Sequence, residues 1–241
     1  MVKSLILLKE KAKRWLNLLK KSDTKTHFCK ICFEPIEEKS FHNFANEVEV
    51  CSKCLASLKP IFKSFKVDGY NALALYNYDE SIRSKIFQLK GCSDIELAKI
   101  FVKPYSFELN LRYRGYNIVF LPSYEGDDNR RGFNHVKEIF SCLNLKICDC
   151  LYKSEHHKQS DQSFKKRKEI EKYIFLKEGV CLKNKKILLV DDICTTGSTL
   201  RAAIKLVKQS NPKKIEILVV AKRDFSKDEL KQISGYIDVL K

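Results

Sequence analysis

The chain has 241 residues, 44% of them hydrophobic, which is enough for one full α/β domain and a small accessory module. Lysine and arginine number 46 against 30 acids, so the formal charge is +16, and this balance favours a polyanionic partner. Lysine is spread along the whole chain, so a basic surface that only confers solubility would give the same number. No run approaches the roughly 18 apolar residues of a membrane-spanning helix, and residues 5–8 are too short for a signal-peptide core.

Residues 1–21 predict a basic amphipathic helix, followed by a short polar linker. The apolar stripe consists of Val2, Leu5, Leu8, Ala12, Trp15, Leu16 and Leu19. We favour a helix that docks on its own domain or on a partner subunit, and the alternative is a helix that rests on a membrane surface.

Residues 27–58 contain two CxxC pairs, Cys29–Cys32 and Cys51–Cys54, separated by 18 residues. Four thiolates at this spacing form the tetrahedral set that structural Zn²⁺ prefers, so we predict a closed, non-catalytic zinc module of zinc-ribbon type. A redox CxxC and an iron–sulfur site are the alternatives, but two pairs at this spacing make a redox role less favoured. The other six cysteines show no framework spacing, and this indicates a reducing compartment.

The middle of the chain alternates strand and helix patterns. Residues 61–66 form a link, 73–78 and 118–121 predict strands, and 80–90 and 95–102 predict helices. A polar loop over 125–135 leads to a helix near 136–143, and 145–151 predicts a further strand. Residues 155–170 are dense in charge and predict a loop. This alternation predicts an α/β domain with a mostly parallel sheet flanked by helices, spanning residues 70–241.

The most informative stretch is Lys186 to Leu200. A buried strand over 187–190 precedes Asp191 and Asp192, and a loop of hydroxyl residues around Gly197 then leads into a helix over 200–207. A final strand covers 215–221. Backbone N–H groups at the start of the helix and the hydroxyls of the loop favour a phosphate, and the two acids could accept hydrogen bonds from ribose hydroxyls. A phosphorylated ribose therefore fits both halves of the pattern.

Three other interpretations compete for this stretch. A Walker A loop needs a lysine before its serine or threonine and more glycine, and this loop has neither. A phospho-acceptor receiver domain begins with such a strand, whereas here only about 50 residues follow it. A plain strand and a helix cap would explain the hydroxyls but not the paired acids.

The stretch resembles the phosphoribosyl-pyrophosphate loop of type I phosphoribosyltransferases. With the cysteine pairs, residues 76–79, Leu121-Pro122 and Arg131-Gly-Phe-Asn134, the chain resembles the ComF family associated with bacterial natural competence, from Cys29 to about Ala221. It departs from the family at Glu125, Asp127 and Asp128, where basic residues are usual, and at His135, where glutamine is usual.

The resemblance implies a type I phosphoribosyltransferase-like fold and a site for phosphoribosyl pyrophosphate or ribose 5-phosphate. It assigns the sugar phosphate to Asp191, Asp192, Thr195, Thr196, Gly197, Ser198 and Thr199. Pro122 and Ser123 would lie on the pyrophosphate side, where Arg130 and Arg131 are candidate donors. Mg²⁺ would arrive with phosphoribosyl pyrophosphate rather than occupy a permanent site. No residue is assigned a catalytic role.

Three functions follow from these features. The first, which the resemblance favours, is the handling of single-stranded DNA during natural transformation, with the competence machinery as a partner. The second is an active phosphoribosyltransferase on an unidentified acceptor, and the third is a ligand-sensing scaffold. We expect a cytoplasmic protein, with peripheral attachment to the inner membrane as the alternative.

Overall fold

The computed structural model describes residues 27–36, 49–123, 125–153 and 174–224. The predicted helix over 1–21 and the predicted charged loop over 155–170 lie outside these residues. Among the described residues, no helix is both long and apolar enough to span a membrane.

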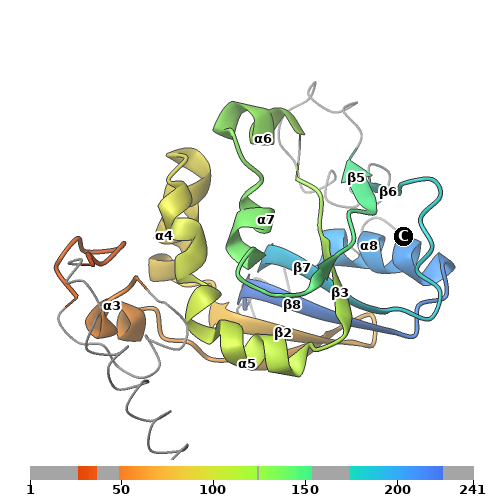
Figure 1. Cartoon of the computed structure of the whole chain (residues 1–241), viewed down its shortest axis with the longest axis horizontal. Helices are drawn as coiled ribbons and strands as arrows, with labels where there is room; N and C mark the ends of the chain where they lie inside the picture. The colour runs from red at the N-terminus through yellow and green to blue at the C-terminus, as the bar shows by residue number, and fades with distance from the viewer. Residues whose placement is uncertain (1–26, 37–48, 124, 154–173, 225–241) are drawn as a thin grey trace, which may run out of the picture.

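The core of the molecule is a six-stranded sheet in the order β1-β2-β8-β7-β3-β4 (Figure 1). All its pairs are parallel except that of β1 with β2. The strands are β1 (Lys63–Val67), β2 (Tyr70–Asn77), β3 (Tyr116–Phe120), β4 (Lys146–Ile147), β7 (Lys186–Cys194) and β8 (Lys214–Lys222). The predicted mostly parallel α/β sheet is confirmed.

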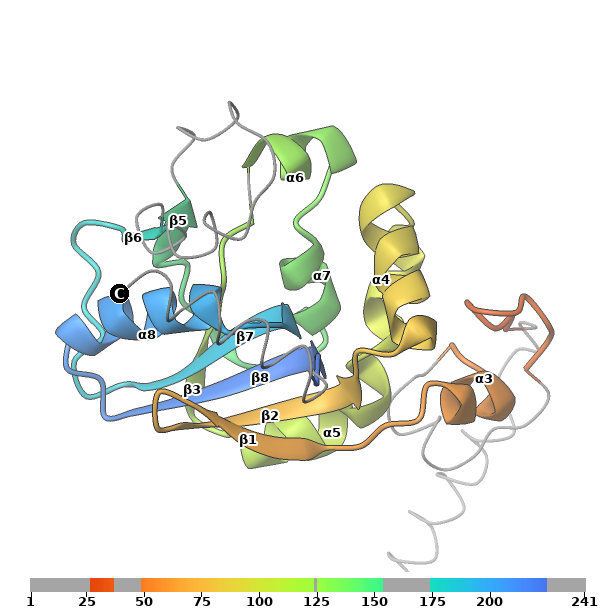
Figure 2. The same ribbon diagram turned by 180° about the vertical axis from the view of Figure 1, so that it is seen from behind.

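Helices cover both faces of this sheet (Figure 2). One face packs against α4 (Glu80–Gly91), α5 (Ser106–Arg112), α7 (His135–Phe140) and the 3-10 helices η1 (Ile95–Ile100) and η2 (Lys103–Tyr105). The other face packs against α8 (Ser198–Gln209) and the antiparallel pair β5 (Leu151–Lys153) and β6 (Ile174–Leu176). Alternation along β7 divides its apolar residues between the two cores, with Leu188 and Val190 in one and Ile187 and Leu189 in the other.

Capping side chains explain where two helices of the first face begin. The Asp79 carboxylate accepts a hydrogen bond from the Ile82 N–H at 3.0 Å, and α4 starts at the next residue. Asn134 caps α7 in the same way by accepting from the Lys137 N–H at 2.9 Å. Each cap satisfies an N–H group that has no partner within its helix.

The four-cysteine module packs against the first of these cores. It contains α3 (Ser52–Ser57) and an isolated bridge between Phe28 and Pro35. Cys29, Val50 and Leu58 are buried in one cluster with Leu73 and Leu75 of β2. The module and the sheet therefore share apolar contacts.

Several predicted elements differ from the structure. The link over 61–66 contains most of β1, which pairs antiparallel with β2. The helix predicted over 95–102 is the shorter 3-10 helix η1, with η2 following it, and the strand predicted over 145–151 is divided between β4 and β5. In each case the apolar residues predicted burial but did not determine the local geometry.

The polar segment predicted as a loop over 125–135 contains a helix, α6 (Glu125–Arg131). Its first turn carries three acids and its last turn two arginines, an order that suits the helix dipole. Two pairs at i,i+3 spacing, Asp127–Arg130 and Asp128–Arg131, add to it. Because α6 contains no apolar side chain, the periodicity of apolar residues could not reveal it.

Candidate functional site

The loop that joins β7 to α8 encloses a pocket of about 130 Å³. It is lined by Asp191 and by residues 193–200, which span the end of β7, the loop and the first turn of α8. All five loop residues predicted to bind a sugar phosphate, Thr195 to Thr199, are brought together here. Hydroxyls and the first turn of a twelve-residue helix thus face one small space.

Gly197 makes the turn into α8 and is its N-cap, with φ of 75°. This left-handed conformation is costly for a residue with a Cβ. A Cβ at this position would also lie 3.3 Å from Arg201 Nη1. The turn leaves the first N–H groups of α8 without partners inside the helix, which is the usual basis of an anion site.

Arg201 supports the loop and was not singled out from the sequence. Its Nη1 donates to the Thr196 carbonyl at 2.9 Å, and its Nη2 donates to Ser198 Oγ at 3.3 Å. Thr196 Oγ1 and Ser198 Oγ are 2.9 Å apart. The only signal in the sequence is its place one turn after Gly197, which puts its side chain back over the loop.

The two adjacent acids point to different sites. The prediction placed both after the end of the strand, but β7 continues through them to Cys194, with Asp191 paired to Val219. Consecutive residues in a strand point to opposite faces. Asp191 consequently lines the loop pocket, whereas Asp192 faces Lys90 of α4 and His135 of α7.

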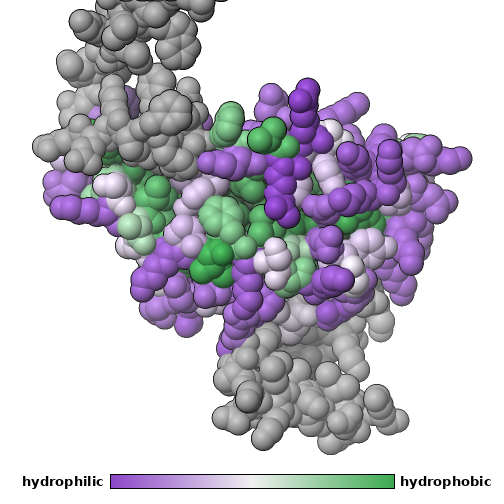
Figure 3. Space-filling model, turned by 90° about the horizontal axis from the view of Figure 1, so that it is seen from below, coloured by the Kyte–Doolittle hydropathy of each residue, from purple (hydrophilic) through white to green (hydrophobic). Residues whose placement is uncertain are grey.

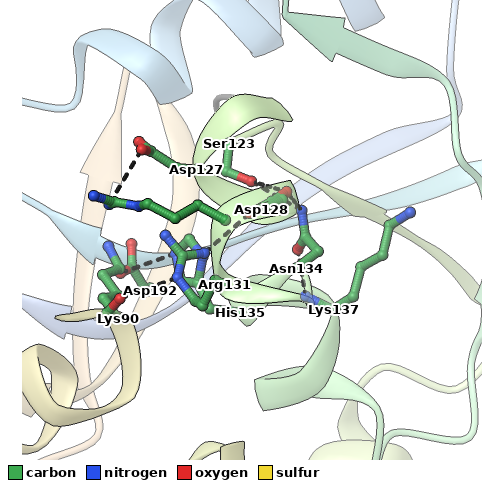
Figure 4. A network of polar contacts seen from close by, with 10 residues as sticks. Lys90, Ser123, Asp127, Asp128, Arg131, Asn134, His135, Lys137 and Asp192 are labelled. Carbon is green, nitrogen blue, oxygen red and sulfur yellow. Dashed lines mark hydrogen bonds and ion pairs between the residues drawn. The ribbon is translucent and has the colours of Figure 1, made fainter. Parts of the chain in front are cut away.

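Asp192 is the buried end of a polar network that joins α4, α6, α7 and β7 (Figure 4). Its side chain is 8% exposed, forms an ion pair with Lys90 and lies 3.4 Å from His135 Nε2. Arg131 continues the network through His135 Nδ1 at 3.1 Å and the Lys90 carbonyl at 3.2 Å. Lys90 and His135 come from elements far apart in sequence, so no local pattern could place them here.

Asp128 connects this network to the end of β3. Its Oδ1 accepts from Arg131 Nη1 at 3.0 Å, and its Oδ2 accepts from Asn134 Nδ2 at 2.7 Å and from the Ser123 hydroxyl. Asp128 and His135, two of the positions at which the chain departs from the family pattern, are therefore both members of this network. Figure 4 shows these side chains converging between the helices.

The pKa values of Asp191 and Asp192 are shifted in opposite directions, because the two carboxyl groups have different surroundings. Burial raises the pKa of Asp191 well above its usual value, and the nearby Asp192 charge raises it further. Burial also acts to raise the pKa of Asp192, but the Lys90 ammonium and His135 outweigh it and lower that pKa. Asp192 is therefore the more readily ionised of the two neighbouring carboxyl groups.

The candidates on the pyrophosphate side are only partly available. Pro122 and Ser123 follow β3 as predicted, and Ser123 is bonded to Asp128. The Arg131 side chain is 7% exposed and already has three polar partners, whereas the Arg130 side chain is 77% exposed. Of the two arginines, Arg130 is the one whose guanidinium faces solvent.

A separate metal site is formed by Cys29, Cys32, Cys51 and Cys54, whose sulfur atoms all lie within 4.8 Å of one another. Backbone N–H groups of Ile31 and Cys51 lie 3.4 Å from Cys29 Sγ, and the Cys54 N–H lies 3.4 Å from Cys51 Sγ. Burial acts to raise the pKa of Cys29, but hydrogen bonds from the backbone of Cys51, Cys32 and Ile31 and from the Cys32 side chain lower it to about 7, which favours a thiolate. Four converging sulfurs fit a structural metal ion, as the spacing predicted.

Comparisons with known proteins agree with this description. The family model "Phosphoribosyl transferase domain" matches residues 129–238. Competence protein ComFC of Streptococcus pneumoniae is 31% identical over 148 residues, which cover 61% of this chain and 66% of that protein. An adenine phosphoribosyltransferase of Campylobacter hominis is 48% identical over 48 residues, 20% of this chain and 25% of that enzyme.

The solved hypoxanthine-guanine phosphoribosyltransferase of Bacillus anthracis is similar to this chain with a TM-score of 0.36 and 16% identity. The aligned region covers 54% of this chain and 72% of that chain. That score is too low to add to the argument. The ComFC similarity, the phosphoribosyl transferase domain and the four-cysteine cluster place the chain in the family that its sequence motifs resembled: it belongs to the ComF family, with a fold of the type I phosphoribosyltransferase class.

Proposed function

We propose that this protein binds a phosphoribosyl ligand, phosphoribosyl pyrophosphate or ribose 5-phosphate, and handles single-stranded DNA during natural transformation. The observation that carries the ligand proposal is the pocket in which Asp191 faces the hydroxyl loop and the start of α8. The 5-phosphate would accept hydrogen bonds from the helix N–H groups and from the hydroxyls of Thr195 to Thr199. Asp191 would accept from a ribose hydroxyl.

Asp192 has a supporting role in this proposal, because Lys90 and His135 already hold its carboxylate. Pyrophosphate would extend from the ribose toward Pro122 and Ser123, where the exposed Arg130 is the available donor. Mg²⁺ would accompany phosphoribosyl pyrophosphate, bound mainly by oxygens of the ligand. The metal of the four-cysteine cluster would be Zn²⁺.

A thermal-shift titration with ribose 5-phosphate tests the ligand site. The ligand should raise the melting temperature of the wild type by linkage, and Asp191→Ala, which removes the acceptor oxygens, should abolish the shift while the protein stays folded. Gly197→Ala should weaken the shift because it closes the turn onto Arg201. Gly69→Ala is the matched control, since Gly69 also has positive φ but a Cβ at that position would meet nothing within 4 Å.

A wild-type response from Asp191→Ala would overturn the placement of the ligand. The role in transformation rests on the ComFC similarity and on the net charge of +16. Deletion of the gene should lower the entry of transforming DNA and leave growth without added nucleobases normal. The active-enzyme alternative predicts instead release of pyrophosphate from phosphoribosyl pyrophosphate in the presence of a free base.

A further inference from the structure

We infer that single-stranded nucleic acid binds at the edge of the sheet where the parallel strands begin, opposite the phosphoribosyl pocket. This inference rests on the proposed DNA-handling function and assigns it a surface. We call this surface the amino edge, and it is defined by six cations at or beside the strand starts: Arg112, Arg114, Lys146, Lys186, Lys213 and Lys214.

The strand register aligns the cations of the amino edge. Tyr116 of β3 pairs with Lys186 of β7, which pairs in turn with Lys214 of β8. On the other side of β3, Lys146 of β4 pairs with Asn117. Neighbouring strands lie about 4.8 Å apart, so the lysines that begin β4, β7 and β8 line one edge of the sheet, with Lys186 and Lys214 on one face and Lys146 on the other.

Three of the six cations lie over two aromatic rings. Lys186 Nζ lies 5.6 Å and Lys214 Nζ 6.0 Å from the Tyr116 ring centre, and Arg112 lies 5.6 Å from that of Tyr113. Both tyrosines are buried, so their rings hold the cations in position and are not themselves exposed for stacking. These three cations are therefore more ordered than lysines spread over a solvated surface.

Acids at the same edge do not cancel this charge. Glu216, near the start of β8, is bonded to Lys214 at 2.5 Å and to the Tyr116 hydroxyl at 3.0 Å. Asp68 lies in the exposed turn between β1 and β2. Lys214 neutralises Glu216, which leaves a net positive edge.

A hollow of about 270 Å³ opens beside these cations and gives the edge a preference for single strands. It is lined by side chains from α5 and the neighbouring strands, among them Arg112, Tyr113, Asn71, Ser64 and Glu216. The amide of Asn71 and the carboxylate of Glu216 can form hydrogen bonds with the edge of one unstacked base. The planar guanidinium of Arg112 can stack on the face of that base. A duplex keeps its bases paired and stacked, and therefore offers no base to this hollow.

The face seen from below combines apolar and hydrophilic areas (Figure 3). Its middle is apolar, whereas hydrophilic side chains crowd the end where β7 and β8 begin. Phe107 and Leu111 of α5 are exposed apolar residues. β7 runs nine residues from Lys186 to Cys194, which is about 26 Å at 3.3 Å per residue. The amino edge and the phosphoribosyl pocket therefore lie at opposite ends of the same strand.

The test compares two full-length triple variants that remove equal charge. The edge variant carries Lys146→Gln, Lys186→Gln and Lys213→Gln, and it keeps Lys214 because that lysine neutralises Glu216. The control variant carries Lys59→Gln, Lys85→Gln and Lys99→Gln. Binding of a fluorescent oligothymidine is titrated at several salt concentrations, and melting curves confirm that each variant is folded.

The wild type should bind the single strand more tightly than the matching duplex. The edge variant should lose affinity, and the slope of log affinity against log salt should become about 2 units less steep, at about 0.7 per phosphate contact. The control variant should keep the wild-type slope. Arg112→Gln should weaken single-strand binding by about tenfold or more and weaken duplex binding much less.

Equal losses in the two triple variants would mean that only overall charge matters, and this would overturn the assignment of the edge. Wild-type binding by the edge variant would place the DNA on another surface and leave the proposed function standing. If the wild-type protein itself does not bind the oligonucleotide, the proposed DNA-handling function fails, and the inference fails with it.

Discussion

At the scale of single residues, adjacent acids have different environments because a strand sends consecutive side chains to opposite faces. Asp191 reaches the hydroxyl loop, and Asp192 reaches a buried ion pair with Lys90. A buried carboxylate without its partner is strongly destabilising, whereas a neutral group of the same shape is tolerated. The Lys90–Asp192 pair therefore holds α4 against the end of β7.

This pair can be tested with Lys90→Met. Because the Lys90 side chain is 34% exposed, we expect a loss of about 1–3 kcal/mol of unfolding free energy at neutral pH, less than for a fully buried pair. Lys90→Met combined with Asp192→Asn should be more stable than Lys90→Met alone, as chemical denaturation would measure. Additive losses in this double-mutant cycle would mean that the two side chains do not interact.

The same variant has a defined pH dependence. The pKa of Asp192 is lowered in the folded protein, so its contribution is complete above the unfolded pKa of about 3.9 and is lost as the pH falls toward the folded value. In Lys90→Met the buried carboxylate can take up a proton instead of remaining unpaired. The cost of Lys90→Met should therefore shrink between pH 7 and pH 4, and a constant cost would contradict this account.

At the scale of elements, the four-cysteine module is joined to the sheet by shared apolar packing. Cys29 and Leu58 are buried in the cluster that also contains Leu73 and Leu75 of β2. A metal that holds the four sulfurs together would also keep Leu58 in place. The loop and α8 form the other functional element, and they pack on the opposite face of the sheet.

We predict one equivalent of Zn²⁺ per chain, measured by elemental analysis. Chelation or Cys32→Ser should lower the main melting transition of the protein by several degrees, because metal binding is coupled to folding and the module shares the core. Cys181→Ser is the control, since Cys181 is exposed and outside the cluster. Folded protein with less than half an equivalent of metal would contradict the zinc assignment.

At the scale of the whole molecule, the two proposed ligands occupy opposite ends of the sheet. The described part of the chain between them consists of buried strands, with Leu188, Leu189 and Val190 of β7 fully enclosed. The loop that would bind the small ligand is already formed, so binding there requires no rearrangement of this core. The two binding events should therefore be nearly independent.

Independence can be measured by thermal shift. Ribose 5-phosphate and oligothymidine added together should stabilise the protein by about the sum of their separate free energies of stabilisation, and each should leave the affinity of the other within about twofold. Mutual exclusion would show that the strand lies over the phosphoribosyl pocket. Strong positive coupling would instead support the ligand-sensing alternative.

Much of the fold could be predicted from the sequence, because its signals are local. The apolar runs at 187–190 and 215–221 predicted β7 and β8, and the spacing of the four cysteines predicted the cluster that the structure forms. The hydroxyl loop around Gly197 likewise lies at the start of α8, as expected. Each of these features depends on residues that are close in sequence or on a single spacing.

Only the tertiary structure decided which side chains meet. Lys90, Asp128, His135 and Asp192 lie on three helices and a strand, and their contacts depend on how α4, α6 and α7 pack on the sheet. The row of cations at the amino edge depends on strand order, which places β7 between β3 and β8. Strand order and helix packing are set by long-range burial of apolar faces, and a pattern read along one segment carries no record of its neighbours.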